Sequence, residues 1–452
     1  MSNHHNGISR RNVLQAAALF LPVWGVSSRA GVAVGEEDRP AVTDPRATSG
    51  DDRFEPNWEE KLTVTVGPEH ADMIGTTDKV IQAAVDYVAH FGGGTVKILP
   101  GTYRFRNAVH LTSNLRLIGS GLDSILMKEA YFGTKLIEDS DWYDQEVTVA
   151  DPSAFKVGDG VALMAKSSYS SVPIVIKRTI VARSGNRFKL DKPLRENVWL
   201  AGDPMANSLF PLLTGEHVEG IFIENLALDG NRDNNPNFNG NYGGNIFFQD
   251  CRRIEMREIT TRYSNGDGIS WQICHDVVVE KCLSQNNADL GLHPGSGSQR
   301  PVIRDNKLES NGLGLFWCWG VRYGLAERNT ITDSKTYGVS IGHCDTDNII
   351  RDNKILRSGQ VGVLFRDETH SFAAHRNQLH NNLIQDIGNE EGIGIDIQGV
   401  TDGVGLEANQ ILETRGPARR IGIRIGQKAT KVQLGKNRIE GFSNDLVDLR
   451  TG

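Results

Sequence analysis

Cysteine and proline are scarce in this chain, and an excess of basic residues is missing. The 452 residues include only 5 cysteines, an odd number that leaves at least one unpaired, and none has the CxxC spacing of a zinc site. Lys and Arg number 49 against 56 Asp and Glu; because the net charge of -7 provides no basic surface for phosphates, we expect no nucleic-acid partner. Glycines number 49 against 15 prolines, which predicts recurring tight turns.

Long apolar runs are also missing, and the longest apolar stretch is a short one near the N-terminus. Arg10 and Arg11 precede that run and small residues follow it, a layout that resembles an export signal of the twin-arginine type. The run is too short to span a bilayer comfortably, although an N-terminal membrane anchor is the alternative interpretation. We therefore expect a signal peptide over residues 1–33 and a charged leader over residues 34–60. The mature protein is expected in the periplasm or outside the cell, with no membrane partner.

A helix is predicted after the leader. Apolar residues recur at helical spacing, Thr77 or Asp78 can serve as the N-cap, and the glycines at 92–94 end the helix. A short strand, "TVKIL", follows directly. The apolar face of the predicted helix consists of Val80, Ile81, Ala84, Val85 and Val88.

From Thr214 onward the sequence repeats itself at intervals of roughly two to three dozen residues, a spacing typical of repeat architectures. Each unit holds strands of about four residues, which are too short for an independent sheet but can pair with the units before and after them. An asparagine at a bend can adopt left-handed backbone geometry, and its amide can bond to the asparagine of the next unit. One series is a glycine before alternating apolar residues: Gly268, Gly314, Gly338, Gly362, Gly394 and Gly422. The other is an asparagine two residues before Leu or Ile: Asn306, Asn329, Asn353, Asn382, Asn409 and Asn437.

These repeats indicate a parallel β-solenoid, and "VIQAAVDYVAHFGGGTVKILPGTYRF" resembles the capping segment of the pectate-lyase-like superfamily. The resemblance implies an all-β fold, a right-handed parallel β-helix with an N-terminal capping helix, in a group of proteins that act mostly on polysaccharides. Hairpin patterns over residues 139–205 predict an inserted β-subdomain. We therefore expect the cap and the first coils over residues 61–138 and the main coils over residues 206–452.

The interior of a β-helix is filled with side chains, so a site must lie on an outer face formed by neighbouring coils. We take Ile269 and Trp271 as inward and continue the alternation through the later coils. This predicts one outward row with small residues in its middle and polar groups around them. The row reads Gln272, His293, Cys318, Gly342, Arg366 and Gln398.

Asp267 and Asp289 precede strands of adjacent coils, so we expect both on one edge of this row. Hydrolysis of a glycosidic bond needs one acid to protonate the leaving oxygen and one carboxylate to activate water or attack. "NGDGIS" and "NADLGLHPG" are similar in part to motifs of the polygalacturonase-type hydrolases, whose paired aspartates are replaced here by Ala288 and Asp289. The resemblance implies catalytic roles for Asp267 and Asp289, with His293 and Arg366 orienting them or the substrate.

Other polar and aromatic residues of the same coils are candidates for substrate binding. Sugar rings pack on exposed aromatic faces and arginine binds acidic groups, whereas Trp317 is expected in the core. Structural alternatives exist, because an aspartate between glycines can close a turn and a charge cluster can be merely solvated. The candidates are Gln272, Trp319, Arg322, Tyr323, His343, Asp367 and Glu368.

Three functions stay open at the level of the sequence. The first is an exported glycoside hydrolase that cleaves a polysaccharide, for which an anionic polymer is one option. The second is a polysaccharide lyase or uronate epimerase, in which His293 or His343 removes a proton and Arg366 neutralises a carboxylate. The third is a non-catalytic carbohydrate-binding β-helix. No metal site and no required cofactor are expected, although a lyase would allow calcium. The sequence favours no oligomeric state.

Overall fold

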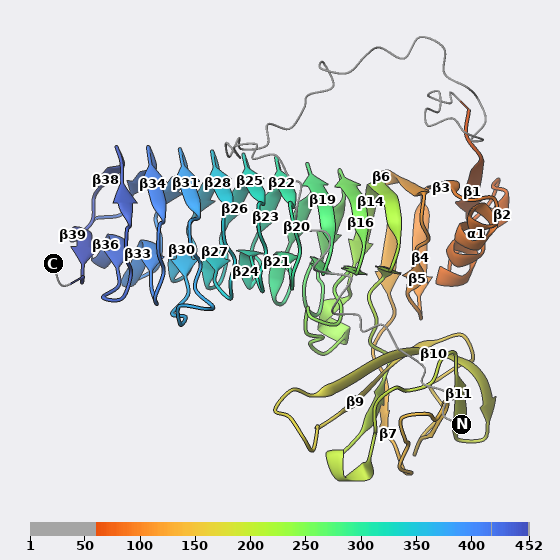
Figure 1. Ribbon diagram of the computed structural model, residues 1–452. Coiled ribbons are helices and arrows are strands. Elements are labelled where there is room, and N and C mark those ends of the chain that lie inside the picture. Colours follow the sequence, from red (N-terminus) through yellow and green to blue (C-terminus); the bar gives the residue numbers. More distant parts are fainter. Residues whose placement is uncertain (1–59, 417, 451–452) are drawn as a thin grey trace, which may run out of the picture. The chain divides into compact units, whose positions relative to one another are not determined.

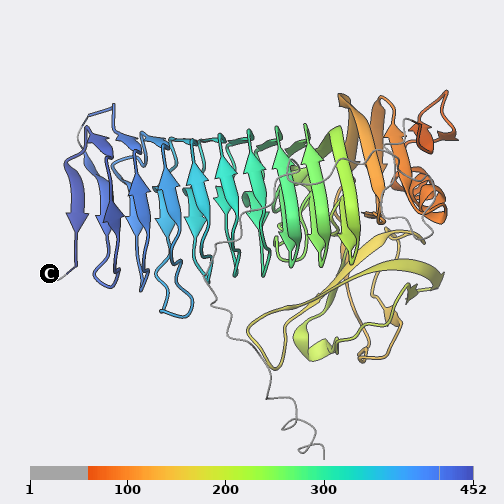
Figure 2. The same cartoon turned by 45° about the horizontal axis from the view of Figure 1, so that its top comes forward.

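The computed structural model describes residues 60–416 and 418–450. The predicted signal peptide, residues 1–33, and all but the last residue of the predicted leader, residues 34–60, lie outside this part of the chain. None of the helices within it is long and apolar enough to cross a membrane. Its regular structure consists mainly of short strands, which Figure 1 and Figure 2 show side by side in successive coils.

The coils have three faces of parallel strands. One face is an 11-stranded sheet, and the other two belong to a 22-stranded sheet because the long strands β6 (Leu115–Lys128) and β14 (Glu219–Asp229) run through both. Each strand pairs with the coils before and after it, so the predicted parallel β-helix is confirmed. The 11-stranded sheet consists of β5 (Val109–His110), β13 (Leu213–Glu216), β15 (Ile246–Gln249), β18 (Ile269–Gln272), β21 (Leu290–Pro294), β24 (Leu313–Phe316), β27 (Tyr337–Ile341), β30 (Val361–Phe365), β33 (Glu391–Ile397), β36 (Arg419–Ile425) and β39 (Asn444–Asp448).

The other strands of the 22-stranded sheet form two runs that meet at β6 and β14. The first run contains β1 (Thr63–Gly67), β2 (Met73–Ile74), β3 (Gly94–Ile98), β16 (Arg252–Arg257), β19 (His275–Glu280), β22 (Val302–Arg304), β25 (Leu325–Glu327), β28 (Ile349–Arg351), β31 (Gln378–His380), β34 (Gly405–Glu407) and β37 (Gln433–Leu434). The second contains β4 (Gly101–Phe105), β17 (Thr260–Arg262), β20 (Leu283–Gln285), β23 (Lys307–Glu309), β26 (Thr330–Thr332), β29 (Lys354–Leu356), β32 (Leu383–Gln385), β35 (Gln410–Leu412) and β38 (Arg438–Glu440).

The predicted capping helix is α1 (Asp78–His90), which packs against β1 and β3 at the first coils. Thr77 is the N-cap residue, although its side chain makes no capping hydrogen bond. The chain after the helix requires a glycine at position 93. Its φ is +128°, and a Cβ there would lie 2.4 Å from the carbonyl oxygen of Asn114. Val80 is only partly buried, whereas Asp78, Ile81, Ala84, Val85 and Val88 are buried.

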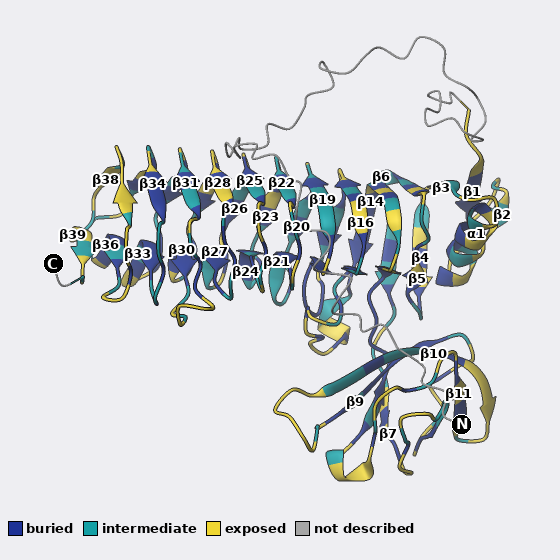
Figure 3. Ribbon diagram, viewed as in Figure 1, coloured by how far each residue is buried: buried dark blue, intermediate teal, exposed yellow. Residues whose placement is uncertain are grey.

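The interior of the coils is a stack of aliphatic side chains, and Figure 3 shows buried residues along every face. In one row the residues that pair in successive coils are of similar size, so each packs directly on its counterpart. Burying one such side chain contributes about 1.5–3 kcal/mol, and this contribution recurs in every coil. One fully buried row is formed by Leu308, Ile331, Ile355, Ile384 and Ile411.

The recurring asparagines form a hydrogen-bonded ladder beside this row. Asn329 donates through Nδ2 and through its backbone N–H to Oδ1 of Asn353, both at 2.9 Å, and its Nδ2 also donates to the carbonyl oxygen of Ile303. The left-handed backbone conformation lies one residue earlier than predicted, at Arg328 and Asp352 with φ of 52° and 56°. The asparagine side chain therefore fixes each coil to the next, and the preceding residue makes the bend.

The recurring glycines let neighbouring coils approach closely. A Cβ at Gly338 would lie 2.7 Å from the carbonyl oxygen of Gly362 and 2.4 Å from Cγ2 of Ile355. A Cβ at Gly362 would in turn lie 2.5 Å from the carbonyl oxygen of Gly394. These distances leave no room for a side chain, which explains why the glycine recurs at this position of the coils.

The inserted β-subdomain is a 6-stranded sheet of antiparallel pairs with an apolar core of its own. The first and last strands of the subdomain pair with each other, Gly133 with Asn207. Arg106 joins the subdomain to the coils by donating to Asp159 through Nε and Nη2 at 2.9 and 2.6 Å. Its elements are β7 (Gly133–Lys135), β8 (Glu146–Thr148), β9 (Gly160–Ala165), β10 (Ile174–Ser184), β11 (Arg187–Leu190), the 3-10 helix η2 (Leu200–Gly202) and β12 (Met205–Asn207). A second 3-10 helix, η3 (Arg232–Asn234), follows β14.

Replacing one ladder asparagine tests its contribution to stability. Asn353→Ala removes the shared acceptor of Asn329 and leaves a buried backbone N–H unpaired, so we expect a loss of about 2–4 kcal/mol and a lower Tm. Lys354→Ala, at an exposed neighbouring position, is the control. Equal melting temperatures of the two variants in a thermal unfolding experiment would show that the ladder adds no stability.

Candidate functional site

A groove of about 710 Å³ lies on the outer side of the 11-stranded sheet, lined by residues of β21 and β24 and by the turn before β18. The loop of residues 237–241 lines it as well. We call this space the groove. Its polar lining includes three residues that the sequence analysis selected as catalytic, Asp267, Asp289 and His293, and one that it missed, Lys335.

Asp267 and His293 form a buried pair on adjacent coils. The Nδ1 atom of His293 lies 2.8 Å from Oδ2 of Asp267 and 3.3 Å from Oγ of Ser270. Ser270 donates its own hydroxyl hydrogen to the carbonyl oxygen of Gly240 at 2.8 Å, so both neighbours of Nδ1 are acceptors. The proton of a neutral His293 therefore sits on Nδ1, and Nε2 carries the basic lone pair. Nε2 is buried and has no hydrogen-bond partner among the described residues.

The carboxylate of Asp267 is enclosed. Its side chain is 1% exposed, and Oδ1 also accepts the backbone N–H of Leu290 at 3.2 Å. Loop residue Gly240 lies so close that a Cβ there would be 1.7 Å from Oδ2. Only glycine fits at that position of the loop. Asp267 is thus placed to orient His293, and both of its carboxylate oxygens are engaged by protein groups.

Asp289 differs from Asp267 because it is only partly buried. Asn237 donates to its Oδ2 at 2.7 Å from the loop. Burial raises the pKa of Asp289, and the nearby charge of Asp267 raises it further, while Asn237 and the positive charge of Lys335 act in the opposite direction. A carboxyl group of this kind in a groove can hold and release a proton closer to neutrality than an ordinary aspartate.

The strand register corrects the predicted outward row at one position. His293 was expected beside Gln272, but it pairs with Ser270, and Leu292 pairs with Ile269. Asp267 consequently lies beside Leu290 and not in the place that corresponds to Asp289. Gln272 is buried next to Gly295 and accepts the backbone N–H of Ser296 at 2.7 Å, and it does not line the groove. The misplacement arose because the apolar residues of "ADLGLHP" alternate with a period of two. Shifting the pairing with the preceding strand by two residues therefore leaves the same side chains inward.

Arg366 and His343 belong to a second group of polar side chains, which we call the His343 cluster: Cys318, His343, Asp345, Arg366 and Glu368. Nε2 of His343 lies 2.8 Å from Glu368, and its Nδ1 lies 3.2 Å from Sγ of Cys318. Arg366 donates to the hydroxyl of Ser340 at 2.8 Å and pairs with Asp345 at 3.4 Å. Its guanidinium lies 4.6 Å from the ring centre of Phe316. The sequence analysis missed Asp345.

The electrostatics of the His343 cluster are dominated by burial. Burial raises the pKa of Asp345 to about 7, although Arg366 and three backbone N–H groups oppose this shift. Burial also lowers the pKa of Arg366 and, together with the charge of Arg366, that of His343. Arg366 donates to Ser340 and to the carbonyl oxygen of Trp317 and pairs with Asp345, so its guanidinium is poorly placed to neutralise a substrate.

Phe316 connects the two groups. Its ring lies edge-on to His293 with centroids 5.3 Å apart, and its other contact is the Arg366 guanidinium. Trp319 stacks on His343 with centroids 5.1 Å apart, is 50% exposed, and contacts Phe372 edge-on. These exposed rings offer apolar faces to a sugar next to the groove. As predicted, Trp317 is in the core.

The other predicted binding residues lie outside the groove. Arg322 and Tyr323 are exposed at a bend, and Asp367 lines a separate surface depression with Arg424. All five cysteines are free thiols. In the ranges that the structure describes, no group of three His, Cys, Asp or Glu side chains is arranged to hold a metal ion.

Comparisons with known proteins agree with this architecture. The family profile described as "Right handed beta helix region" matches residues 244–449. The A-module of the mannuronan C-5 epimerase AlgE4 from Azotobacter vinelandii is similar in fold, with 15% identity, a TM-score of 0.50, and coverage of 83% of this chain and 96% of that one. The Dettilon tailspike protein shows 12% identity, a TM-score of 0.51, and coverage of 85% and 68%. No curated protein sequence matches. The protein has the fold of a right-handed parallel β-helix, as predicted.

The raised pKa of Asp345 predicts a pH-dependent stability. The folded pKa of about 7 exceeds the ordinary value of 3.8, so the stabilising contribution is fully present below about pH 4 and is lost as the pH rises through 7. Asp345→Asn carries no titrating proton and should flatten the fall of Tm across this window, whereas Asp352→Asn, at an exposed position, should keep the wild-type profile. Identical pH profiles of Tm for wild type and Asp345→Asn would contradict the assignment.

Proposed function

We propose that the protein is a carbohydrate-active enzyme that removes a proton from a uronate residue of an anionic polysaccharide bound in the groove. The observation that carries this proposal is the buried Asp267–His293 pair, whose Nε2 has no partner among the described residues. A buried polar atom without a partner destabilises the fold by about 1–3 kcal/mol, and a substrate group beside Nε2 would relieve this loss.

In this proposal His293 is the general base. Nε2 takes the proton from the carbon next to the uronate carboxylate, and the electron pair of that C–H bond moves toward the carboxylate. Asp267 accepts the Nδ1–H and stabilises the imidazolium that forms, so it is a positioning residue and not the reacting acid. This assignment replaces hydrolysis by two aspartates, because both carboxylate oxygens of Asp267 are engaged by the protein: Oδ2 faces Nδ1 of His293, and Oδ1 accepts the backbone N–H of Leu290.

Lys335 and Asp289 supply the remaining groups. Lys335 lines the groove and provides a positive charge for the substrate carboxylate, a role that the sequence analysis gave to Arg366. Asp289, with its raised pKa, is placed to hand a proton to the leaving glycosidic oxygen in an elimination, or to the carbon from the opposite side in an epimerisation. The first outcome forms a carbon–carbon double bond as the C–O bond breaks, and the second leaves the chain intact.

The products on a panel of uronate polymers distinguish the reactions. A lyase produces unsaturated ends that absorb ultraviolet light, an epimerase changes the uronate composition seen by NMR without new ends, and a hydrolase produces reducing ends without that absorbance. The AlgE4 module, which shares the fold, is by its name an epimerase of the uronate polymer mannuronan, and this similarity supports testing such polymers first. Reducing ends without ultraviolet absorbance would contradict proton abstraction and restore the hydrolase.

Variants of the pair test the role of His293. His293→Gln and Asp267→Asn should each lower kcat by about 10²–10⁴-fold. The first variant removes the base, and the second removes the carboxylate that fixes the tautomer and the orientation of the base. His380→Gln, on β31 in the other sheet, is the matched control and should keep full activity. Circular dichroism checks that each variant is folded. Full turnover by a folded His293→Gln variant would rule out this base.

A variant of Lys335 tests the anionic substrate. Lys335→Gln should raise KM for the polymer by about fivefold, the scale of an exposed ion pair, and change kcat less. Added salt should raise the KM of the wild type and have little effect on the KM of the variant. Lys307→Gln, on β23 away from the groove, is the control. An unchanged KM for Lys335→Gln would show that the substrate carboxylate is held elsewhere.

A further inference from the structure

A second cavity of about 340 Å³ lies between the inserted β-subdomain and the first coils, and it takes no part in the mechanism above. We call it the subdomain pocket. Its wall on the coil side comes from β5, β13 and β15, and its other wall comes from β10 and the segment that follows β11. The volume is that of a site for a small ligand or one unit of a larger one.

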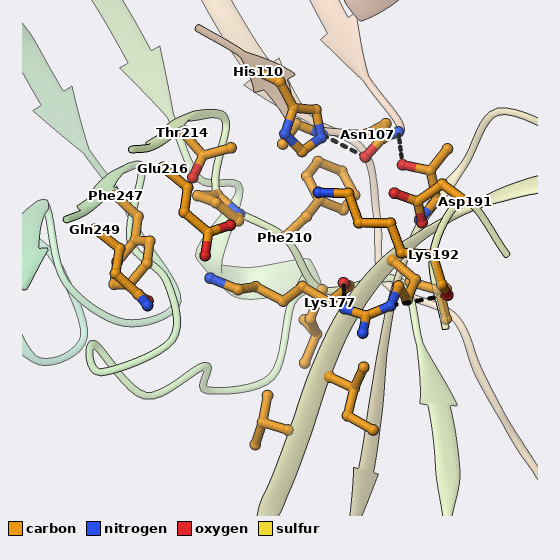
Figure 4. A pocket seen from close by; sticks show the side chains of 18 of the residues that line it. Asn107, His110, Lys177, Asp191, Lys192, Phe210, Thr214, Glu216, Phe247 and Gln249 are labelled. Atoms are coloured by element: carbon orange, nitrogen blue, oxygen red, sulfur yellow. Dashed lines mark hydrogen bonds between the residues drawn. The ribbon is translucent and has the colours of Figure 1, made fainter. Parts of the chain in front are cut away.

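Polar side chains converge in the subdomain pocket. Figure 4 shows Lys177, Lys192, His110 and Glu216 directed toward a common space, with Phe210 and Phe247 beside it. Nζ of Lys177 donates to the carbonyl oxygen of Tyr242 at 2.6 Å and lies 4.0 Å from the ring centre of Phe247. Within the described residues neither lysine forms an ion pair with a carboxylate.

Two neighbouring charged residues of the subdomain pocket, Arg178 and Asp191, already bond to the protein backbone. Arg178 donates to the carbonyl oxygens of Pro193 and Leu194 and so holds the segment that carries Lys192. Asp191 accepts the backbone N–H of Thr179 at 2.8 Å. Lys192, His110 and Glu216, together with the N–H groups of Lys177 that Tyr242 does not use, are among the groups that can meet a ligand. Burial lowers the pKa of Lys177 to about 8, which a bound anion would reverse.

This combination fits an acidic sugar. Two ammonium groups suit a single carboxylate, while His110 and Glu216 suit hydroxyl groups, and the two phenylalanine rings suit the C–H face of a pyranose. Glu216 repels any anion, but it repels a phosphate dianion about twice as strongly as a single carboxylate, so a phosphate fits less well.

The subdomain pocket and the groove lie on one line along the coils. Phe247 of the pocket pairs with Ser270, and Ser270 pairs with His293. Strands of adjacent coils are about 4.8 Å apart, so Phe247 is about 10 Å from the backbone of the proposed base. One loop contacts both spaces: the carbonyl oxygen of Gly240 accepts a hydrogen bond from Ser270, and that of Tyr242 accepts one from Lys177.

We infer that the subdomain pocket binds the carboxylated pyranose of a uronate unit that lies two or more units away from the reacting one, in the same polysaccharide chain. The inserted subdomain thereby extends the substrate-binding surface toward the N-terminal coils and makes the enzyme respond to chain length. This inference rests on the proposed function only for the statement that the pocket and the groove hold one chain.

Binding of single sugars tests the subdomain pocket without any catalysis. Glucuronate, galacturonate and mannuronate are titrated calorimetrically into the full chain carrying His293→Gln, with glucose as the neutral counterpart. At least one uronate should bind, and its affinity should fall by about tenfold or more in a background with Lys177→Met and Lys192→Ala. Lys189→Ala, on β11 outside the pocket, is the control. Equal uronate affinity with and without the two lysines, or glucose bound as tightly as the uronates, would overturn the inference.

A length series tests the link between the two spaces. Affinity for oligouronates should rise by about tenfold once they are long enough to fill both, and Lys192→Ala should abolish this rise. A rise that persists in Lys192→Ala would overturn the shared chain. The absence of any product from uronate polymers, with uronate binding still dependent on Lys192, would contradict the proposed function and leave the pocket in place.

Discussion

The whole structure depends on the register of one coil on the next. Buried side chains of successive coils pack on one another in a fixed match, because a close-packed interior has little space for a shift. The buried asparagine ladder enforces the match, since each Oδ1 accepts from both the side chain and the backbone of the preceding asparagine. A slip by one residue would turn the inward row outward and break the ladder at the same time. Register is therefore fixed twice, by packing and by hydrogen bonds.

That register also builds the candidate site, because it determines which outward side chains become neighbours. It sets His293 beside Ser270 and turns its ring toward Asp267. The loop of residues 237–241 then closes over Asp267, and only a glycine at position 240 permits the approach. The same loop brings Asn237 to Asp289. A rigid stack and one loop thus divide two similar aspartates into an enclosed one that orients and a partly buried one that can exchange protons.

The inserted β-subdomain enlarges this surface without disturbing the stack. It leaves the coils at β7 and returns at β12, which pair with each other, so the coils on either side keep their register. Its cationic side chains face the coils beside Phe247, one coil before Ser270. Outward side chains of a β-helix do not pack in its core, so these positions can vary. An insertion beside them can add functional groups without destabilising the fold.

The sequence by itself determined the architecture, since α1, the glycine and asparagine series and the short strands follow local rules of period and turn that hold in every coil. It also placed Asp267, Asp289 and His293 on neighbouring coils. Only the tertiary structure decided their partners. His293 lies beside Gln272 or Ser270 according to the register of strand pairing, and the alternation in "ADLGLHP" allows two registers that differ by two residues. The sequence analysis missed Lys335, Asn237 and Asp345. Their burial and their charged neighbours come from segments of the chain that meet only in the folded coils.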